Sequence, residues 1–174
     1  MELDETQRSL IAAIDSARSE ILSVSHSIHG RPELGKEEVF ASTLVADTLE
    51  SAGFTVEHGY AGLPTALRAA KGTAGYRVAF LAEYDALPVI GHGCGHNLIT
   101  AAALGAGIGL GAVVKSCGGQ VLVIGTPAEE TDGAKVAMVA HGCFDNIDAA
   151  FMVHPYDGNY AEVESLAMDA LELK

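Results

Sequence analysis

Three separate segments of the chain carry side chains that bind metal ions or transfer protons. A glycine-rich loop holds Cys94 and His96 two residues apart, Glu129 and Glu130 stand side by side, and His154 lies further along. Thiolate, imidazole and carboxylate groups together are typical ligands of zinc and of related transition metals. Taken singly, each has a plain structural explanation, because a lone cysteine is usually a small buried hydrophobe and paired acids often end a strand in solvent.

Considered together, these groups predict a hydrolytic metal site. In an extended loop, residues two apart point to the same side, so Cys94 and His96 can reach one ion. Glu130 would supply an oxygen ligand and His154 a nitrogen ligand. A catalytic zinc keeps one position for water and lowers the pKa of that water, and a nearby carboxylate takes the proton. Glu129, beside a ligand, suits the role of this base.

Two further residues of the same region each have two alternative roles. Asp85 could hydrogen-bond a ligating imidazole and fix its tautomer, or it could simply begin the turn at Ala86-Leu87-Pro88. His92 either orients a metal ligand without binding the metal itself or packs within the loop, and we favour the first role. We expect purely structural roles for four other histidines: His26, His29, His58 and His141. Cys117 and Cys143 are expected to be inert.

Hydrophobic periodicity predicts the elements that position these groups. We expect helices at 4–29, 37–51, 97–116 and 134–141. We expect strands at 54–58, 66–70, 76–83, 120–126 and 147–153, and residues 166–173 alternate again. Buried strands that alternate with helices predict an α/β fold, here a three-layer α/β/α arrangement with a mostly parallel central sheet.

The order of these elements predicts that the chemical groups meet. In parallel sheets, ligands bind beyond the carboxyl ends of the strands. Asp85 and the glycine loop follow one strand, Glu129 and Glu130 follow the next, and His154 follows a third. We therefore expect all of them at one edge of the sheet. The glycines within 105–111 do not form a nucleotide loop, because they lie inside a helix pattern; we expect them to allow close packing.

Composition excludes several classes of function. The 174 residues carry a formal net charge of −13, which argues against nucleic acid or an anionic membrane as partner. The longest apolar run, 98–114, is short for a bilayer and rich in Ala and Gly, so we expect a buried helix. Three widely spaced cysteines and an acidic N-terminus without a signal peptide predict a reducing compartment, the cytoplasm.

The chain also resembles a known family, metallopeptidase family 20, the dinuclear-metal aminoacylases and carboxypeptidases. The resemblance rests on four motifs in order: IHGRPELG at 28–35, YDALP at 84–88, GHGCGHN at 91–97 and TPAEE at 126–130. Asn97 stands where many members have Asp. This variant, together with Glu83-Tyr84-Asp85, is most similar to the branch of p-aminobenzoyl-glutamate hydrolases and of cytosolic dipeptidases that act on basic C-terminal residues, the Xaa-Arg type.

The resemblance implies hydrolysis of the amide bond of an N-acyl amino acid or dipeptide by two divalent metal ions. Zinc is the first expectation, with manganese or cobalt as alternatives. If the family's functional residues are carried over to this sequence, the metal ligands are Cys94, His96, Glu130 and His154. The resemblance also implies that Glu129 and Asp85 are catalytic. His92 and Asn97 are expected to orient the ligands.

Family members continue well past this length, with an inserted lid or dimerisation domain and a later histidine ligand. We therefore expect residues 1–164 to be the N-terminal part of the catalytic domain and 165–174 to begin the lid. The resemblance implies an incomplete second metal site and little activity for the 174 residues alone, and a homodimer for the full-length enzyme.

Two other functions compete with the enzyme hypothesis. The fold could serve as a non-catalytic metal-binding or interaction remnant. Glu129 argues for descent from an enzyme, because a structural metal site needs no free base beside it. A small redox protein built on Cys94 is disfavoured, because no second cysteine lies nearby in sequence.

Overall fold

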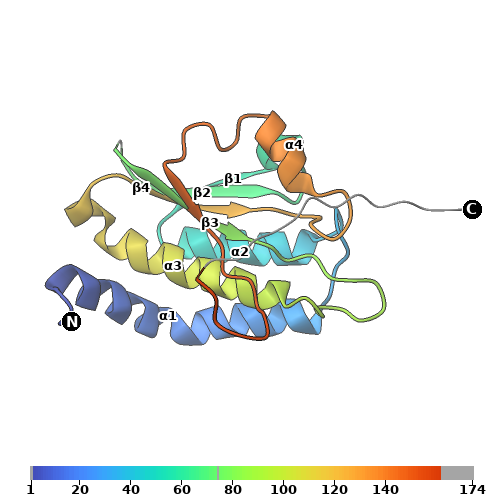
Figure 1. Cartoon of the computed structure of the whole chain (residues 1–174), viewed down its shortest axis with the longest axis horizontal. Coiled ribbons are helices and arrows are strands. Elements are labelled where there is room, and N and C mark those ends of the chain that lie inside the picture. The colour runs from blue at the N-terminus through green and yellow to red at the C-terminus, as the bar shows by residue number, and fades with distance from the viewer. Residues whose placement is uncertain (1, 74, 162–174) are drawn as a thin grey trace, which may run out of the picture.

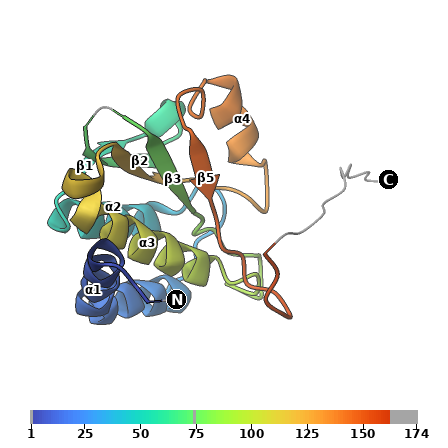
Figure 2. The same ribbon diagram turned by 60° about the vertical axis from the view of Figure 1, so that its left-hand side comes forward.

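The computed structural model describes residues 2–73 and 75–161, and in it the chain folds into layers around one sheet (Figure 1). Helices α2 (Val39–Ser51) and α3 (His96–Cys117) cover one face, and α1 (Glu5–Gly30) packs on the outer side of α3. The short helix α4 (Ala134–Ala140) covers the other face, where its Met138 is fully buried against the sheet. The expected α/β/α layering is thus confirmed, with α1 as an additional outer helix (Figure 2).

Within the described residues, the sheet contains five strands in the order β1-β2-β4-β3-β5. Their bounds are β1 (Thr55–His58), β2 (Leu67–Gly72), β3 (Arg77–Ala82), β4 (Gln120–Gly125) and β5 (Ala149–Phe151). β3 is parallel to both β4 and β5, whereas β2 is antiparallel to β4 and β1 is antiparallel to β2. Four strands therefore point the same way and β2 opposes them, so the sheet is mostly parallel, as predicted. A short 3-10 turn, Tyr60–Gly62, lies between β1 and β2.

The expectation of a long, buried strand at 147–153 is wrong. β5 spans only Ala149–Phe151 and, in the part of the chain that the structure describes, pairs with β3 alone, so it is an edge strand there. The side chains of Phe151, Met152 and Val153 are 55%, 41% and 67% exposed. An apolar run can therefore mark an edge as well as a centre, because composition does not reveal how many neighbours a strand has. The alternating segment 166–173 lies outside the described residues.

Local sequence explains where the first two helices begin. Asp4 and Gln7 form a capping box on α1: the Asp4 carboxylate accepts from the Gln7 backbone N–H at 2.8 Å, and the Gln7 side chain accepts from the Asp4 N–H at 3.0 Å. At α2, the Glu33 carboxylate accepts from the backbone N–H groups of Phe40 and Ala41, at 3.0 and 2.9 Å. Both caps satisfy N–H groups that the helix itself leaves free.

Glycines let α3 lie unusually close to its neighbours. A Cβ atom at Gly107 would lie 2.4 Å from a methyl group of Val123 on β4, and one at Gly109 would lie 2.7 Å from Ile14 on α1. By length and composition α3 could cross a membrane, but here it is largely covered by α1 and the sheet. Its glycines serve packing, as expected, on the sheet side and on the α1 side alike.

Candidate metal centre

The register of the two central strands brings the chemical groups to one edge. β3 and β4 end opposite each other, at Ala82 and Gly125. The backbone N–H of Thr126 continues the pairing by donating to Ala82 at 2.8 Å. Consequently the residues that follow β3, Glu83 and Asp85, lie beside the loop that follows β4.

A buried carboxylate fixes the loop between β4 and α4. Glu38 is fully buried, and its side chain accepts from the backbone N–H of Ala128 at 2.7 Å and from the hydroxyl of Thr65 at 2.9 Å. Ala128 has a φ of 54°, a left-handed conformation that costs energy for a residue with a Cβ atom. The carbonyl of Thr65 in turn accepts from the hydroxyl of Tyr84. This network ties together the loops that carry Glu83 and Glu129.

His96, the first residue of α3, lies at the centre of the cluster. Its Nδ1 is 2.9 Å from the Asp85 carbonyl and 3.0 Å from the Asp85 carboxylate. Both of those oxygens can only accept, so Nδ1 carries the proton and Nε2 is the atom available to a metal. That Nε2 is 3.7 Å from Glu130 and 4.0 Å from Glu129. Asp85 therefore holds the ring in the orientation that a ligand needs.

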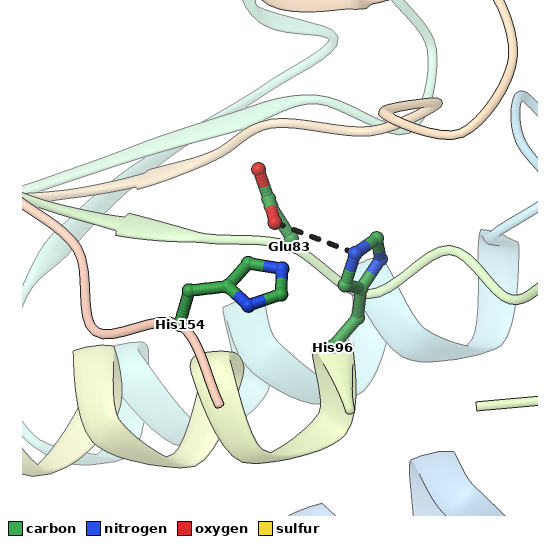
Figure 3. Close-up of side chains that lie close together, drawn as sticks. All are labelled: Glu83, His96 and His154. Atoms are coloured by element: carbon green, nitrogen blue, oxygen red, sulfur yellow. Dashed lines mark ion pairs between the residues drawn. The ribbon is translucent and has the colours of Figure 1, made fainter. Parts of the chain in front are cut away.

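Glu83 and His154 complete the group around His96 (Figure 3). The Glu83 Oε2 atom is 3.5 Å from His96 Nε2, and both side chains are 1% exposed. The ring of His154 meets the ring of His96 edge-on, at 6.2 Å between centroids. One ligand atom from each of Glu83, His96 and His154 lies within 4.8 Å of the other two, and the same holds for His96, Glu129 and Glu130.

Two buried atoms of this cluster have no hydrogen-bond partner among the described residues, Glu83 Oε2 and His96 Nε2. Buried polar atoms are rarely left unpaired, because an unmade hydrogen bond costs about 1–3 kcal/mol. An oxygen and a nitrogen that face each other unpaired match what a divalent cation requires. The donor set of carboxylates and imidazoles therefore fits a transition-metal ion.

The electrostatics of the site are dominated by burial and by the crowding of acids. Burial raises the pKa of Glu129, and repulsion from the Glu83 carboxylate raises it further. Burial also raises the pKa of Asp85, and it is the largest single effect, but the hydrogen bond and charge of His96 and the backbone N–H groups of Glu130 and Glu129 together leave that pKa below its ordinary value. For His96, burial is the largest effect and lowers the pKa, whereas the carboxylate and carbonyl of Asp85 and the charge of Glu83 together raise it above the ordinary value.

Cys94 reaches the site through Glu130. The hydrogen bond between the thiol and the Glu130 carboxylate, together with burial, raises the pKa of Cys94 to about 11. The thiol sulfur is outside both groups of mutually close ligand atoms.

His92 and Asn97 lie beside the cluster. His92 stacks on His29 with 6.2 Å between ring centroids, and both of its ring nitrogens are buried without a partner in the described part of the chain. The Asn97 amide donates to the Ser25 hydroxyl of α1 at 3.0 Å. Both residues line a cavity of about 530 Å³ with Cys94 and His154. His29, for which we expected only a structural role, lines this cavity too.

Sequence reasoning missed Glu83 as a candidate ligand. The signal was present, since Glu83 and Asp85 are two residues apart at the end of β3 and so share one side of the chain. An acid before a turn is common, however, and the sequence pattern alone does not single it out. The structure is more informative, because it leaves Glu83 Oε2 buried and unpaired among the residues that it describes.

Comparisons with known proteins give several matches. The model of Peptidase family M20/M25/M40 matches residues 79–169. The Xaa-Arg dipeptidase of Mus musculus is 38% identical over 99% of this chain and 43% of its own length. A p-aminobenzoyl-glutamate hydrolase polypeptide of Escherichia coli (strain K12) is 35% identical, over 88% of this chain and 36% of its own length.

A solved structure shares the fold. A dinuclear metal binding peptidase of the M20 family from Bacillus subtilis superposes with a TM-score of 0.65 at 24% identity, over 78% of this chain and 42% of that chain. The chain thus spans about two fifths of the length of the relatives that it matches.

Proposed function

Since the chain belongs to Peptidase family M20/M25/M40, we propose that it carries the metal-binding part of an enzyme that hydrolyses the amide bond of an N-acyl amino acid or dipeptide. The observation that carries the proposal is the pair of buried, unpaired atoms Glu83 Oε2 and His96 Nε2, 3.5 Å apart at the strand ends. Family membership alone would indicate a hydrolase, whereas this pair supports a particular place for the metal.

The proposed ligands are His96, Glu130, His154 and Cys94, with Glu83 as a further oxygen donor. Two divalent ions are expected, in keeping with the dinuclear relative, and zinc is preferred because thiolate and imidazole ligands favour it. When bound, these ions would polarise the scissile carbonyl and make a water molecule acidic.

The remaining steps belong to side chains of this chain. Asp85 keeps the proton on His96 Nδ1 and so leaves Nε2 free as a ligand. Glu129 is the proposed general base: its side chain is 40% exposed, and burial together with repulsion from Glu83 raises its pKa above the ordinary value. It would take a proton from the attacking water and deliver it to the departing amine. His92 and Asn97 would shape the cavity beside these groups.

The substrate class rests on the relatives. Their names, Xaa-Arg dipeptidase and p-aminobenzoyl-glutamate hydrolase, describe amides that carry an amino acid on the leaving side. A reducing compartment such as the cytoplasm is proposed because all three cysteines are free. We also propose that the 174 residues alone turn over little substrate, since the chain spans 43% and 36% of those two relatives. Homodimer formation by a longer enzyme stays a prediction.

Metal binding by the chain, followed calorimetrically with Zn²⁺ and Mn²⁺ after chelation, tests the proposal. We expect tight binding that His96→Ala removes, while Glu129→Gln binds metal but loses whatever turnover the parent has. Glu57→Gln, an exposed acid on β1, is the matched control. Turnover of p-aminobenzoyl-glutamate and of Xaa-Arg dipeptides is compared with the mouse relative assayed in parallel.

Metal binding that survives His96→Ala would contradict the proposed site. Turnover that equals the mouse relative would contradict the proposal of low activity in these 174 residues. Tight, His96-dependent binding with little or no turnover in either assay is the result that the proposed metal site and the proposed low activity together predict.

A further inference from the structure

Lys135 contacts the metal centre from α4, on the face of the sheet opposite α3. Its Nζ forms an ion pair with Oε1 of Glu83, a side chain that is only 1% exposed, while the Lys135 side chain is 29% exposed. The ammonium group therefore reaches inward from a partly open position. The function proposed above does not use this residue.

The ion pair gives the two oxygens of Glu83 different roles. Oε1 is held by Lys135, whereas Oε2 has no partner among the described residues and faces His96 Nε2 at 3.5 Å. Figure 3 shows this oxygen directed at the His96 ring, with His154 beside it. A carboxyl group turns easily about its last torsion, so an anchor on one oxygen decides where the other one points.

The position of Lys135 is itself fixed by packing. Its helix is held on the sheet by Met138, which is fully buried and packs against Leu122 and Ile124. Ala134, the residue before Lys135, is also buried. The helix starts after Gly133, whose φ of 61° makes the sharp turn out of the preceding loop. Lys135 is thus presented by an element that packing holds in place.

Lys135 also acts on a second carboxylate of the site. It lowers the pKa of Glu129, in opposition to the larger effects of burial and of Glu83, which raise it. The ammonium group is therefore close enough to influence both the proposed base and the carboxylate that carries the unpaired ligand oxygen. Such a position suits a group that orients one carboxylate while it balances the charge of the other.

We propose that Lys135 is a positioning residue of the metal centre: by holding Oε1 of Glu83, it directs Oε2 toward the ion bound by His96 and His154. The inference rests on the proposed function, since it requires a metal ion at this place. It adds a residue from a fourth segment of the chain, and it assigns Glu83 a single coordinating oxygen.

A double-mutant cycle on zinc affinity tests this role without relying on activity. The variants are Lys135→Met, Glu83→Gln and the pair together, with Lys135→Arg as the conservative replacement. Lys115→Met is the matched control, because Lys115 is exposed on α3 away from the cluster. Affinity is measured by competition with a chromophoric chelator, and Co²⁺ absorption spectra report the ligand geometry.

We expect Glu83→Gln to weaken zinc binding by roughly ten-fold or more, because loss of a ligand's charge should cost at least as much as loss of a group that orients a ligand. Lys135→Met should weaken it by about three-fold to ten-fold and alter the Co²⁺ spectrum, with Lys135→Arg close to the parent. Since Lys135 acts through Glu83, the double variant should bind no more weakly than Glu83→Gln alone.

Zinc binding by Lys135→Met that equals or exceeds the parent overturns the inference, because the ammonium would then only repel the cation. Additive losses in the double variant overturn it too, because Lys135 would then act independently of Glu83. Failure of the proposed function is distinguishable: the parent itself would bind no zinc, or His96→Ala would bind as tightly as the parent.

Discussion

Replacing Glu38 should damage the metal centre from a distance. This carboxylate is fully buried, and its hydrogen bonds go to groups other than the proposed ligands. It accepts the N–H of Ala128 at 2.7 Å and the hydroxyl of Thr65 at 2.9 Å, and so holds the loop that carries Glu129 and Glu130. The same N–H belongs to a residue in the left-handed conformation, which a free loop would abandon.

The magnitude follows from these two bonds. A hydrogen bond to a charged group contributes about 1.5–3 kcal/mol, and a buried N–H left without an acceptor loses the whole of it. Glu38→Ala should therefore lower the free energy of unfolding by about 3–5 kcal/mol. Glu38→Gln keeps an oxygen that can accept from the Ala128 N–H but places an amide group next to the Thr65 hydroxyl. It should therefore lower the free energy of unfolding by only about 1–2 kcal/mol.

Urea unfolding of the chelator-treated chain, followed by circular dichroism, measures the loss in free energy of unfolding for Glu38→Ala and for Glu38→Gln. Glu37→Ala is the matched control, since Glu37 is the exposed neighbour and should change stability by no more than about 0.5 kcal/mol. Zinc affinity is measured on Glu38→Gln, which should remain folded and bind more weakly than the control. A loss below about 1 kcal/mol for Glu38→Ala, with unchanged zinc affinity in Glu38→Gln, would refute the reasoning.

Two further outcomes follow from packing and from charge. Gly107→Ala should destabilise the chain by about 1–3 kcal/mol in thermal unfolding, because its Cβ atom would lie 2.4 Å from a methyl group of Val123. Gly105→Ala should stabilise the chain slightly, because its Cβ atom would lie 3.7 Å from Ile21, an ordinary contact distance. The pKa of His96 is raised through Asp85, so in metal-free protein their pairing stabilises the fold below about pH 6.5 and this contribution is lost as pH rises through the raised value. Asp85→Asn should therefore cost more stability at about pH 5.5 than at about pH 8.5, and an equal cost at both would argue against the pairing.

Much of the scaffold was predictable from the sequence, because its signals are local. The capping residue Asp4, the small residues of α3 and the apolar run of β4 each dictate their own element within a residue or two. The meeting of strand ends also followed from sequence, since parallel strands bring their carboxyl ends to one edge. These predictions required no knowledge of side-chain contacts.

What escaped prediction depends on contacts between distant segments. Nothing near Glu83 in the sequence indicates that one of its oxygens is anchored by Lys135, 52 residues later. Likewise, the tie between Glu38 and Ala128 spans 90 residues and joins a helix start to a loop. The edge position of β5 was missed for the same reason, because the partner that a strand lacks leaves no trace in its own residues.

Metal content per chain tests the central claim most directly. The 174-residue protein is purified without chelators, and its zinc, manganese and cobalt are measured by mass spectrometry beside His96→Ala and the Glu57→Gln control. The account predicts at least one tightly held divalent ion per chain in the parent and the control, and its loss in His96→Ala. A parent without stoichiometric metal, which also fails to bind added zinc, would contradict the claim that these strand ends form a metal centre.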